Sequence, residues 1–193
     1  MKTIVLFLFS FIPVLSFSQD FEIITGVCGT EFGTPFSIAK DKIQAFFEEQ
    51  NNPPQTSSVD STSILSQISE MGNLLAAKRK PSPLIIGNTI QYMYQSFEGI
   101  KFENIYFNFD DEMCFSSVSF WIYCENKKEA LKTITEIADV IQMKHTLFEG
   151  RSDDGTPIYG GGFPNKESNK CGIYLHVYEN KDVVLSFQKV KVK

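Results

Sequence analysis

The spacing of apolar residues changes several times along this chain, and each change marks a predicted helix or strand. Apolar side chains recur at helical spacing from Phe36 to Phe47. Thr34 is a suitable N-cap for this segment, and Pro35 fits the first position inside a helix. The pattern therefore predicts a helix from Thr34 to about Gln50, after which a loop rich in Asn and Pro begins.

Two further segments have the same helical spacing. The first covers about residues 61–78, and Pro81 ends it. The second begins with Asn126 as its N-cap, has Glu129 three residues later as the other half of a capping box, and ends near His145. The sequence therefore predicts three helices.

Between and after these helices, apolar and polar residues alternate with the period of two that is typical of strands with one buried face. The polar run from Asp110 to Glu112 predicts a turn between two of the strands. The stretch from Gly150 to Pro164 is rich in Gly, Asp and Pro, and no helix or strand is predicted in it. The predicted strands are 89–95, 102–109, 117–124, 172–178 and 183–190.

The last two predicted strands repeat the pattern of an earlier pair. Residues 172–178 align with 104–110, and residues 185–187 align with 118–120, so that matching apolar positions fall on the same face. Each pair of strands follows a helix. We therefore predict an α+β fold of two related helix-then-β-meander units, with the helices packed on one face of an antiparallel sheet.

The two units have predicted boundaries at the helix starts. The first unit is expected to span residues 19–125, with the helix 61–78 as an extra element, and the second to span 126–193. A chain of this length is sufficient for one large core. Both units are therefore expected to belong to one compact domain.

The first 18 residues have the pattern of a secretory signal peptide. Lys2 precedes an apolar run, and the small residues Ser16 and Ser18 suit cleavage before Gln19. The run is shorter than a membrane span requires and contains Pro13, so a transmembrane anchor is not expected. The sequence predicts export to the periplasm or the exterior, with no membrane anchor after cleavage.

Export changes the interpretation of the cysteines, because disulfides persist in oxidising compartments. An even number of cysteines predicts disulfides, and the candidates are Cys28, Cys114, Cys124 and Cys171. A strand between Cys114 and Cys124 would hold the two side chains too far apart for a bond. We expect Cys28 to pair with Cys124 or with Cys171.

Charge and motifs exclude several functions. With a net charge of −5 and no basic stripe, the chain is a poor partner for nucleic acid or for an anionic membrane. His145 and His176 are the two histidines, and no third ligand accompanies them at zinc spacing. The adjacent acids at 110–112 and 153–154 are typical of solvated turns, not of a facing carboxylate pair. The glycines at 160–162 lack the lysine and helix of a phosphate loop, and they predict flexible backbone or a bulge. No catalytic residue, metal site or cofactor is predicted.

The best candidate for a binding surface is the side of the sheet opposite the helices. Alternation places aromatic residues on this side, where they can stack on sugars or anchor a protein partner. The alternative is internal packing under a loop, under the helix 61–78, or against the other unit. The candidate binding residues are Tyr106, Trp121, Tyr123, Tyr174, His176 and Tyr178.

Three short motifs carry a resemblance to a known group of proteins. The motifs are Gly29-Thr30-Glu31-Phe32-Gly33-Thr34 before a helix, Ile90-Gln91-Tyr92, and Gly99-Ile100-Lys101-Phe102. Together they resemble an uncharacterised family of exported bacterial α+β proteins. The helix-then-meander units are also similar in architecture to β-lactamase inhibitor protein and to small outer-membrane assembly lipoproteins, although no cysteine for lipidation directly follows the signal peptide. The resemblance implies a fold and no particular activity.

These patterns together predict a non-enzymatic binding or protein-interaction module of the cell envelope, with a protein or a glycan as its partner on the aromatic side of the sheet. The alternative prediction is an envelope hydrolase of glycans or peptides, in which the fold brings carboxylates together.

Overall fold

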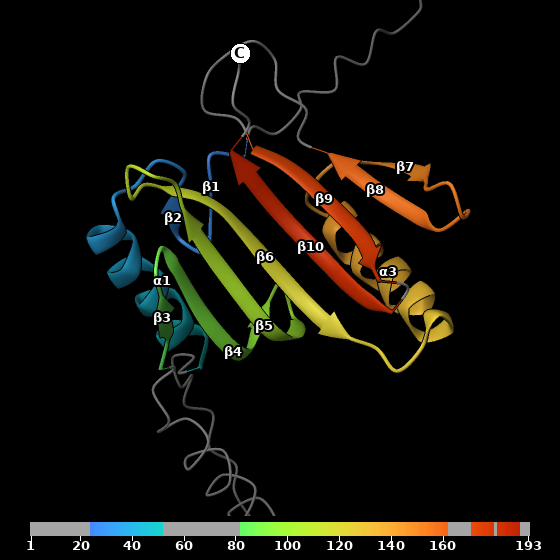
Figure 1. The fold of residues 1–193 in the computed structure, drawn as a ribbon, viewed down its shortest axis with the longest axis horizontal. Coiled ribbons are helices and arrows are strands. Elements are labelled where there is room, and N and C mark those ends of the chain that lie inside the picture. Colours follow the sequence, from blue (N-terminus) through green and yellow to red (C-terminus); the bar gives the residue numbers. More distant parts are fainter. Residues whose placement is uncertain (1–23, 52–81, 162–170, 180, 190–193) are drawn as a thin grey trace, which may run out of the picture.

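The structure, a computed structural model, describes residues 24–51, 82–161, 171–179 and 181–189. The predicted signal peptide 1–18 and the predicted helix 61–78 lie outside these ranges. Figure 1 shows how the elements are arranged. In chain order they are β1 (Gly26–Val27), β2 (Thr30–Glu31), α1 (Phe36–Asn51), β3 (Leu84–Ile86), β4 (Thr89–Phe97), β5 (Ile100–Phe109), β6 (Phe115–Tyr123), α3 (Lys127–Gln142), β7 (Leu147–Arg151), β8 (Pro157–Gly161), β9 (Cys171–Tyr178) and β10 (Asp182–Lys189).

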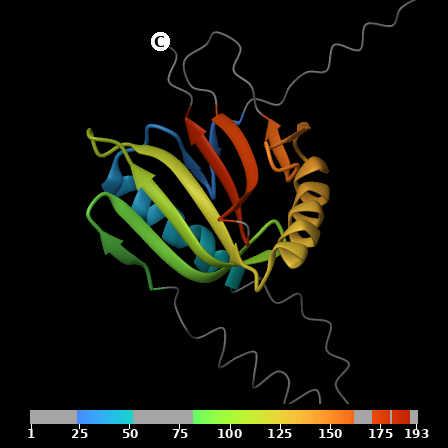
Figure 2. The same ribbon diagram turned by 45° about the vertical axis from the view of Figure 1, so that its right-hand side comes forward.

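Eight strands form one antiparallel sheet in the order β3-β4-β5-β6-β10-β9-β8-β7. β1 and β2 form a separate hairpin. β10 lies at the centre of the large sheet, where it pairs with β6 on one side and β9 on the other. Figures 1 and 2 show both helices on the same side of this sheet, α1 against its β3–β6 half and α3 against its β7–β10 half. The predicted combination of helices with a large antiparallel sheet is confirmed.

The core lies between the two helices and the face of the sheet that they cover. The strand register aligns buried side chains from six neighbouring strands in one row. This row contains Tyr92, Ile105, Phe120, Leu185, Leu175 and Tyr159. Phe47 of α1 packs on Tyr92 and Phe107, with ring centroids 4.8 and 6.1 Å away. The apolar stripe of α3 covers the other half of the sheet, and its buried members are Ala130, Ile134, Ile137, Ala138 and Ile141.

The alternating segments form strands where their period predicted them. β4, β5, β6, β9 and β10 coincide with the five predicted strands to within a few residues. The predicted turn after β5 is also present, because the Asp110 carboxylate accepts hydrogen bonds from the backbone N–H groups of Glu112 and Cys114, at 3.1 and 2.9 Å. This local bonding pattern is typical of Asp in turns.

The start of α1 differs from the prediction by one residue. The first helical hydrogen bond runs from the N–H of Ala39 to the carbonyl of Pro35, at 2.9 Å, so Pro35 holds the N-cap position. The predicted N-cap, Thr34, instead accepts a backbone hydrogen bond from Phe115 at 2.8 Å. Pairing with the start of β6 fixes Thr34 outside the helix, and the assignment of Thr34 as N-cap is wrong.

The start of α3 agrees with the prediction. The Asn126 side chain accepts a hydrogen bond from the N–H of Glu129 at 3.1 Å. The Glu129 carboxylate reaches back to the N–H of Glu125 at 2.8 Å, one residue before the cap. Both bonds satisfy backbone donors that have no partner within the helix.

The stretch from Gly150 to Pro164, in which no strand was predicted, contains most of a β-hairpin. β7 and β8, which pair with each other, lie mostly within this stretch. In β8, Gly161 is so close to the residue before β7 that an added Cβ would be 2.4 Å from the carbonyl oxygen of Thr146. Gly160 and Gly161 therefore belong to strand β8 instead of a flexible or bulged segment. Neither strand alternates clearly, which is why the period-two pattern did not reveal them.

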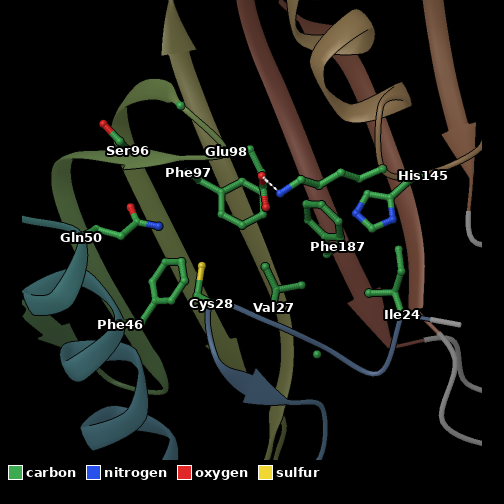
Figure 3. Close-up of a pocket in the computed structure, with 13 residues that line it drawn as sticks. Ile24, Val27, Cys28, Phe46, Gln50, Ser96, Phe97, Glu98, His145 and Phe187 are labelled. Carbon is green, nitrogen blue, oxygen red and sulfur yellow. Dashed lines mark hydrogen bonds and ion pairs between the residues drawn. The ribbon is translucent and has the colours of Figure 1, made fainter. Parts of the chain in front are cut away.

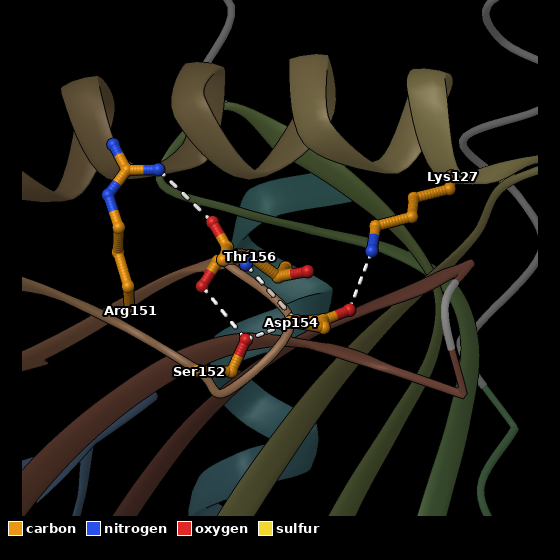
Figure 4. A network of polar contacts seen from close by, with 6 residues as sticks. Lys127, Arg151, Ser152, Asp154 and Thr156 are labelled. Carbon is orange, nitrogen blue, oxygen red and sulfur yellow. Dashed lines mark hydrogen bonds and ion pairs between the residues drawn. The ribbon is translucent and has the colours of Figure 1, made fainter.

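The turn of this hairpin is fixed by Asp154, as Figure 4 shows. The Asp154 carboxylate accepts hydrogen bonds from the Ser152 hydroxyl at 2.5 Å and the N–H of Thr156 at 3.1 Å. It also forms an ion pair with Lys127 of α3, at 2.6 Å. These bonds lower the pKa of Asp154 well below its usual value of 3.8, with the bond to Lys127 as the largest cause. The hairpin is thus tied to the first turn of α3.

β4 changes the face of its side chains near Tyr94, which has a φ of 54°. Ile90 and Tyr92, which precede Tyr94, are buried on the helical side of the sheet. With regular alternation Phe97 would lie on the opposite side, but it is buried on the same side as they are. Phe97 stacks on Phe120 with ring centroids 4.6 Å apart. The tip of the β4–β5 hairpin therefore covers the middle of the helical side of the sheet.

Candidate functional site

The side of the sheet opposite the helices, here called the aromatic face, consists of four rows of side chains that cross the strands. One row spans all eight strands: Leu84, Gln91, Tyr106, Ser119, Ser186, Tyr174, Gly160 and Phe148. A second row on one side of it contains Ile86, Thr89, Asn108, Ser117, Gln188 and Gly172. On the other side, the third row contains Met93, Asn104, Trp121, Val184 and His176, and the fourth contains Tyr123, Asp182 and Tyr178.

The aromatic face is almost uncharged. In these four rows Asp182 is the one residue with a formal charge, although 21% of the residues in the chain are charged. His176 does not add a charge at neutral pH, because burial lowers its pKa below the usual 6.5. Apart from Asp182, the side chains of this sheet face are thus neutral, whereas a sheet face that meets water ordinarily carries polar residues, among which charged ones are common.

Trp121 lies at the centre of a cluster of rings on this face. Its indole is edge-on to Tyr178 at a centroid distance of 5.5 Å and edge-on to Tyr106 at 6.3 Å. Tyr123 is the third neighbour, also at 6.3 Å. Edge-to-face contacts of this kind stabilise aromatic pairs beyond the effect of simple burial. The cluster joins β5, β6 and β9, so three separate parts of the chain hold Trp121 in place.

Amide side chains connect the rings. The Gln91 amide donates to the Asn104 carbonyl at 2.6 Å, and the Asn104 amide donates to the Tyr123 hydroxyl at 3.0 Å. In the next row, the Thr89 hydroxyl donates to Asn108 at 3.1 Å, and Asn108 donates to Ser117 at 3.2 Å. These bonds orient the polar groups of the face and leave several of their remaining donor and acceptor positions for other partners.

Two polar atoms within the cluster have no hydrogen-bond partner in the described part of the chain. They are the indole Nε1 of Trp121 and one carboxylate oxygen, Oδ1, of Asp182. Asp182 is 8% exposed and directly opposite both Tyr123 and Tyr178 in the sheet. A buried polar atom without a partner is costly, and such atoms in native proteins commonly indicate a missing water, ion or ligand.

The structure brings together most of the residues that the sequence proposed for this site. Tyr106, Trp121, Tyr123 and Tyr178 form the ring cluster, and the last two are 47% and 44% exposed. Tyr174 and His176 lie on the same face, in the rows that contain Tyr106 and Trp121. The described helices leave this side of the sheet uncovered (Figure 2).

Sequence reasoning missed the polar members of the site. Gln91, Asn104 and Asp182 were not proposed as binding residues. Alternation already placed Asn104 opposite the core positions of its strand, so the strand pattern was a usable signal for this residue. Asp182 immediately precedes a predicted strand, and its contact with the rings depends on a register that the sequence does not reveal.

A cavity of about 790 Å³ lies on the helical side of the sheet. Figure 3 shows it between α1, the β1–β2 turn and the tip of the β4–β5 hairpin. Its apolar lining includes Phe46, Phe97 and Phe187. Glu98 at the hairpin tip forms an ion pair with Lys144, which follows α3. This pair joins the first half of the fold to the second.

The titratable side chains in the described lining of this cavity are Cys28, Glu98, Lys144 and His145. The thiol of Cys28 lines it, but burial, with a smaller contribution from Glu98, raises the pKa of that thiol well above its usual value of 9.0. A thiol with a raised pKa is a poor nucleophile. Glu98 is the one carboxylate in the described lining, whereas glycoside hydrolysis requires two.

The predicted disulfides of Cys28 are not present. Cys28, Cys114 and Cys124 are free thiols in the structure. Cys28 is buried in the β1–β2 turn, whereas Cys124 follows β6 and lies 3.8 Å from the Thr133 hydroxyl of α3. As predicted, a strand, β6, separates Cys114 from Cys124. The side chain of Cys171 lies outside the described part of the structure.

The described residues contain no group of three or more His, Cys, Asp or Glu side chains that could hold a metal ion. Among these residues there is also no helix long and apolar enough to cross a membrane. Comparison of the chain with protein-family models, with curated proteins and with solved structures gives no match.

Proposed function

We propose that this protein is a non-enzymatic binding module of the cell envelope or exterior, and that its contact surface is the aromatic face around Trp121. One observation carries the proposal, namely a connected cluster of Trp and Tyr rings on a sheet face with a single formal charge. Depletion of charge together with enrichment in Tyr and Trp is typical of the centre of binding interfaces.

The location rests on the signal-peptide pattern of residues 1–18. Cleavage before Gln19 would release a protein whose aromatic face is available to partners outside the cytoplasm. N-terminal sequencing of the exported protein tests this part of the proposal, and a product that begins at Met1 would contradict it.

We also propose that the fold contains two related units. α1 precedes β3–β6, and α3 precedes β7–β10, and the two sets of strands meet in mirrored order at the β6–β10 pair. In this arrangement the aligned core residues Ile105 and Ile173 occupy equivalent strands, β5 and β9. The proposed binding surface would then lie at the junction of the units, since Trp121 comes from the first and Tyr178 from the second.

The experiment compares three immobilised forms of the exported protein for the material that each retains from an envelope fraction. Trp121→Ala removes the centre of the cluster. Tyr94→Ala is the matched control, because Tyr94 is the most exposed aromatic residue described and makes no ring contact with the cluster among the described residues.

We expect wild type and Tyr94→Ala to retain the same components and Trp121→Ala to lose them. Urea unfolding of each variant establishes that the comparison is between folded proteins. If folded Trp121→Ala retains everything that wild type retains, the aromatic face is not the contact surface.

A further inference from the structure

We infer that the aromatic face binds a neutral polysaccharide chain. This inference rests on the proposed function and specifies the chemistry of the partner. Its starting point is the unusual combination of exposed rings, amide and hydroxyl side chains, and near absence of charge on one face of the described sheet.

The absence of charge selects against ionic ligands. A charged polymer gains affinity from opposite charges on the protein, and the described charges at this face are carboxylates, those of the buried Asp182 and of Glu179 beside Tyr178. An acidic polysaccharide or a nucleic acid would find no cation in the four rows. The partner that matches is therefore itself uncharged.

The polar groups select against a purely apolar partner. The polar groups that the face presents to solvent include the phenol hydroxyls of the exposed Tyr123, Tyr174 and Tyr178 and the amide of the half-buried Gln91. An apolar surface that covers such groups removes their hydrogen bonds with water and supplies none in return. A polyhydroxylated ligand both donates and accepts hydrogen bonds, so it can satisfy them.

The amide side chains of the face likewise combine hydrogen-bond donors and acceptors. The half-buried Gln91 carries a donor and an acceptor group, the buried Asn104 orients it and the Tyr123 hydroxyl through hydrogen bonds, and Tyr123 itself is exposed. Side chains of this type form directional bonds with sugar hydroxyls and position a pyranose ring. The apolar C–H side of that ring can then lie on the half-exposed rings of Tyr123 and Tyr178.

The shape of the face suits a chain more than a single small molecule. The row from Leu84 to Phe148 crosses eight strands, and with strands about 4.8 Å apart it is roughly 30 Å long. The ring contacts of Trp121 are direct, so the cluster forms a continuous platform and not a cage around an empty centre. A platform of this length accommodates several successive sugar units.

Native gel electrophoresis with polysaccharide in the gel tests the inference. The gels contain cellulose-, xylan-, mannan-, chitin-, α-glucan- or β-glucan-type neutral polymers, and alginate serves as the acidic polymer. We expect at least one neutral polymer to retard wild type and Tyr94→Ala, alginate to have no effect, and Trp121→Ala to bind at least tenfold more weakly.

A second measurement uses the chain's single tryptophan. Titration with oligosaccharides of the retarding polymer should change the emission of Trp121, and Tyr123→Phe, which removes an exposed hydroxyl and keeps the ring, should weaken binding without loss of folding. If no neutral polymer retards the protein, the inference is wrong. If, in addition, wild type retains envelope proteins in the capture experiment and Trp121→Ala does not, the proposed function remains and the partner is a protein.

Discussion

The indole of Trp121 meets the phenol ring of Tyr178 edge-on at 5.5 Å, although β10 lies between their strands. The two side chains therefore reach across Val184, which occupies the same row as Trp121 and is buried even though it is on the side away from the helices. This contact makes the centre of the aromatic face dependent on parts of the chain that are distant in sequence.

Replacing Tyr178 with Ala should expose one side of Trp121. We expect a red shift in tryptophan emission, stronger quenching by acrylamide, and a decrease of about 0.5–1.5 kcal/mol in the free energy of unfolding from the lost ring pair. Tyr174→Ala is the control, since Tyr174 lies on the same strand and face and has no described ring contact with Trp121. Equal emission changes in both variants would contradict the described packing.

Tyr92 should tolerate conversion to Phe. Its ring is almost completely buried between α1 and the sheet, and its hydroxyl has no hydrogen-bond partner among the described residues. Removing an unpartnered buried hydroxyl removes a penalty of about 1–3 kcal/mol. We expect the urea midpoint of Tyr92→Phe to equal or exceed that of wild type, and a clear decrease would show that the hydroxyl has a partner.

The same residue predicts a loss of stability at high pH. Burial, with a smaller contribution from Glu48, raises the pKa of Tyr92 from 10.0 to about 12. Between these values the unfolded chain releases a proton that the folded chain retains, so stability falls as pH rises. Ultraviolet titration should show one tyrosine that ionises near pH 12 in wild type, and Tyr92→Phe should lack it.

Asp154 predicts the opposite pH dependence. Its pKa is lowered in the folded protein, so its stabilising effect is complete above the unfolded value of 3.8 and is lost as pH falls toward the folded value. Asp154→Asn should therefore be less stable than wild type at pH 7, and the difference should shrink in acid. Asp153→Asn, at the exposed neighbouring position, is the control, and an equal pH dependence in both variants would exclude the Lys127 pair as the cause.

Cys28 should react slowly with thiol reagents. Its thiol is buried and its raised pKa keeps it protonated at neutral pH. In reduced, folded protein we expect iodoacetamide to label Cys28 about tenfold or more slowly than the partly exposed Cys114, as measured by mass spectrometry of digests. The difference should vanish in urea, and equal rates in the folded protein would mean that the β1–β2 turn opens readily.

Local patterns were sufficient to predict the longer elements. The alternation in β5 and β6 and the capping residues of α3 are encoded within a few neighbouring residues, such as Asn126 and Glu129. β3 and β7 have no such signal, because they are short edge strands whose side chains are mostly exposed on both faces. They form because they pair with the neighbouring strands β4 and β8, and their own sequences carry no strand pattern.

The candidate site was predictable in part for the same reason. Alternation placed Tyr106 and Trp121 on the side away from the helices, and in the structure their ring centroids are 6.3 Å apart on that side. The order of strands determines the other contacts, since Tyr178 and Asp182 approach Trp121 through the pairing of β10 with β6. That pairing joins distant segments, and no local pattern specifies its register.

The central position of β10 also has a consequence for the order in which the molecule assembles. β10 is the last strand in the described chain, and until it arrives the long edges of β6 and β9 have no neighbour on that side. Unpaired edges of this kind attract other strands, and contacts between distant segments form slowly. Synthesis, which begins at the N-terminus, therefore leaves the sheet in two parts until β10 is made, and insertion of β10 is the step that joins them.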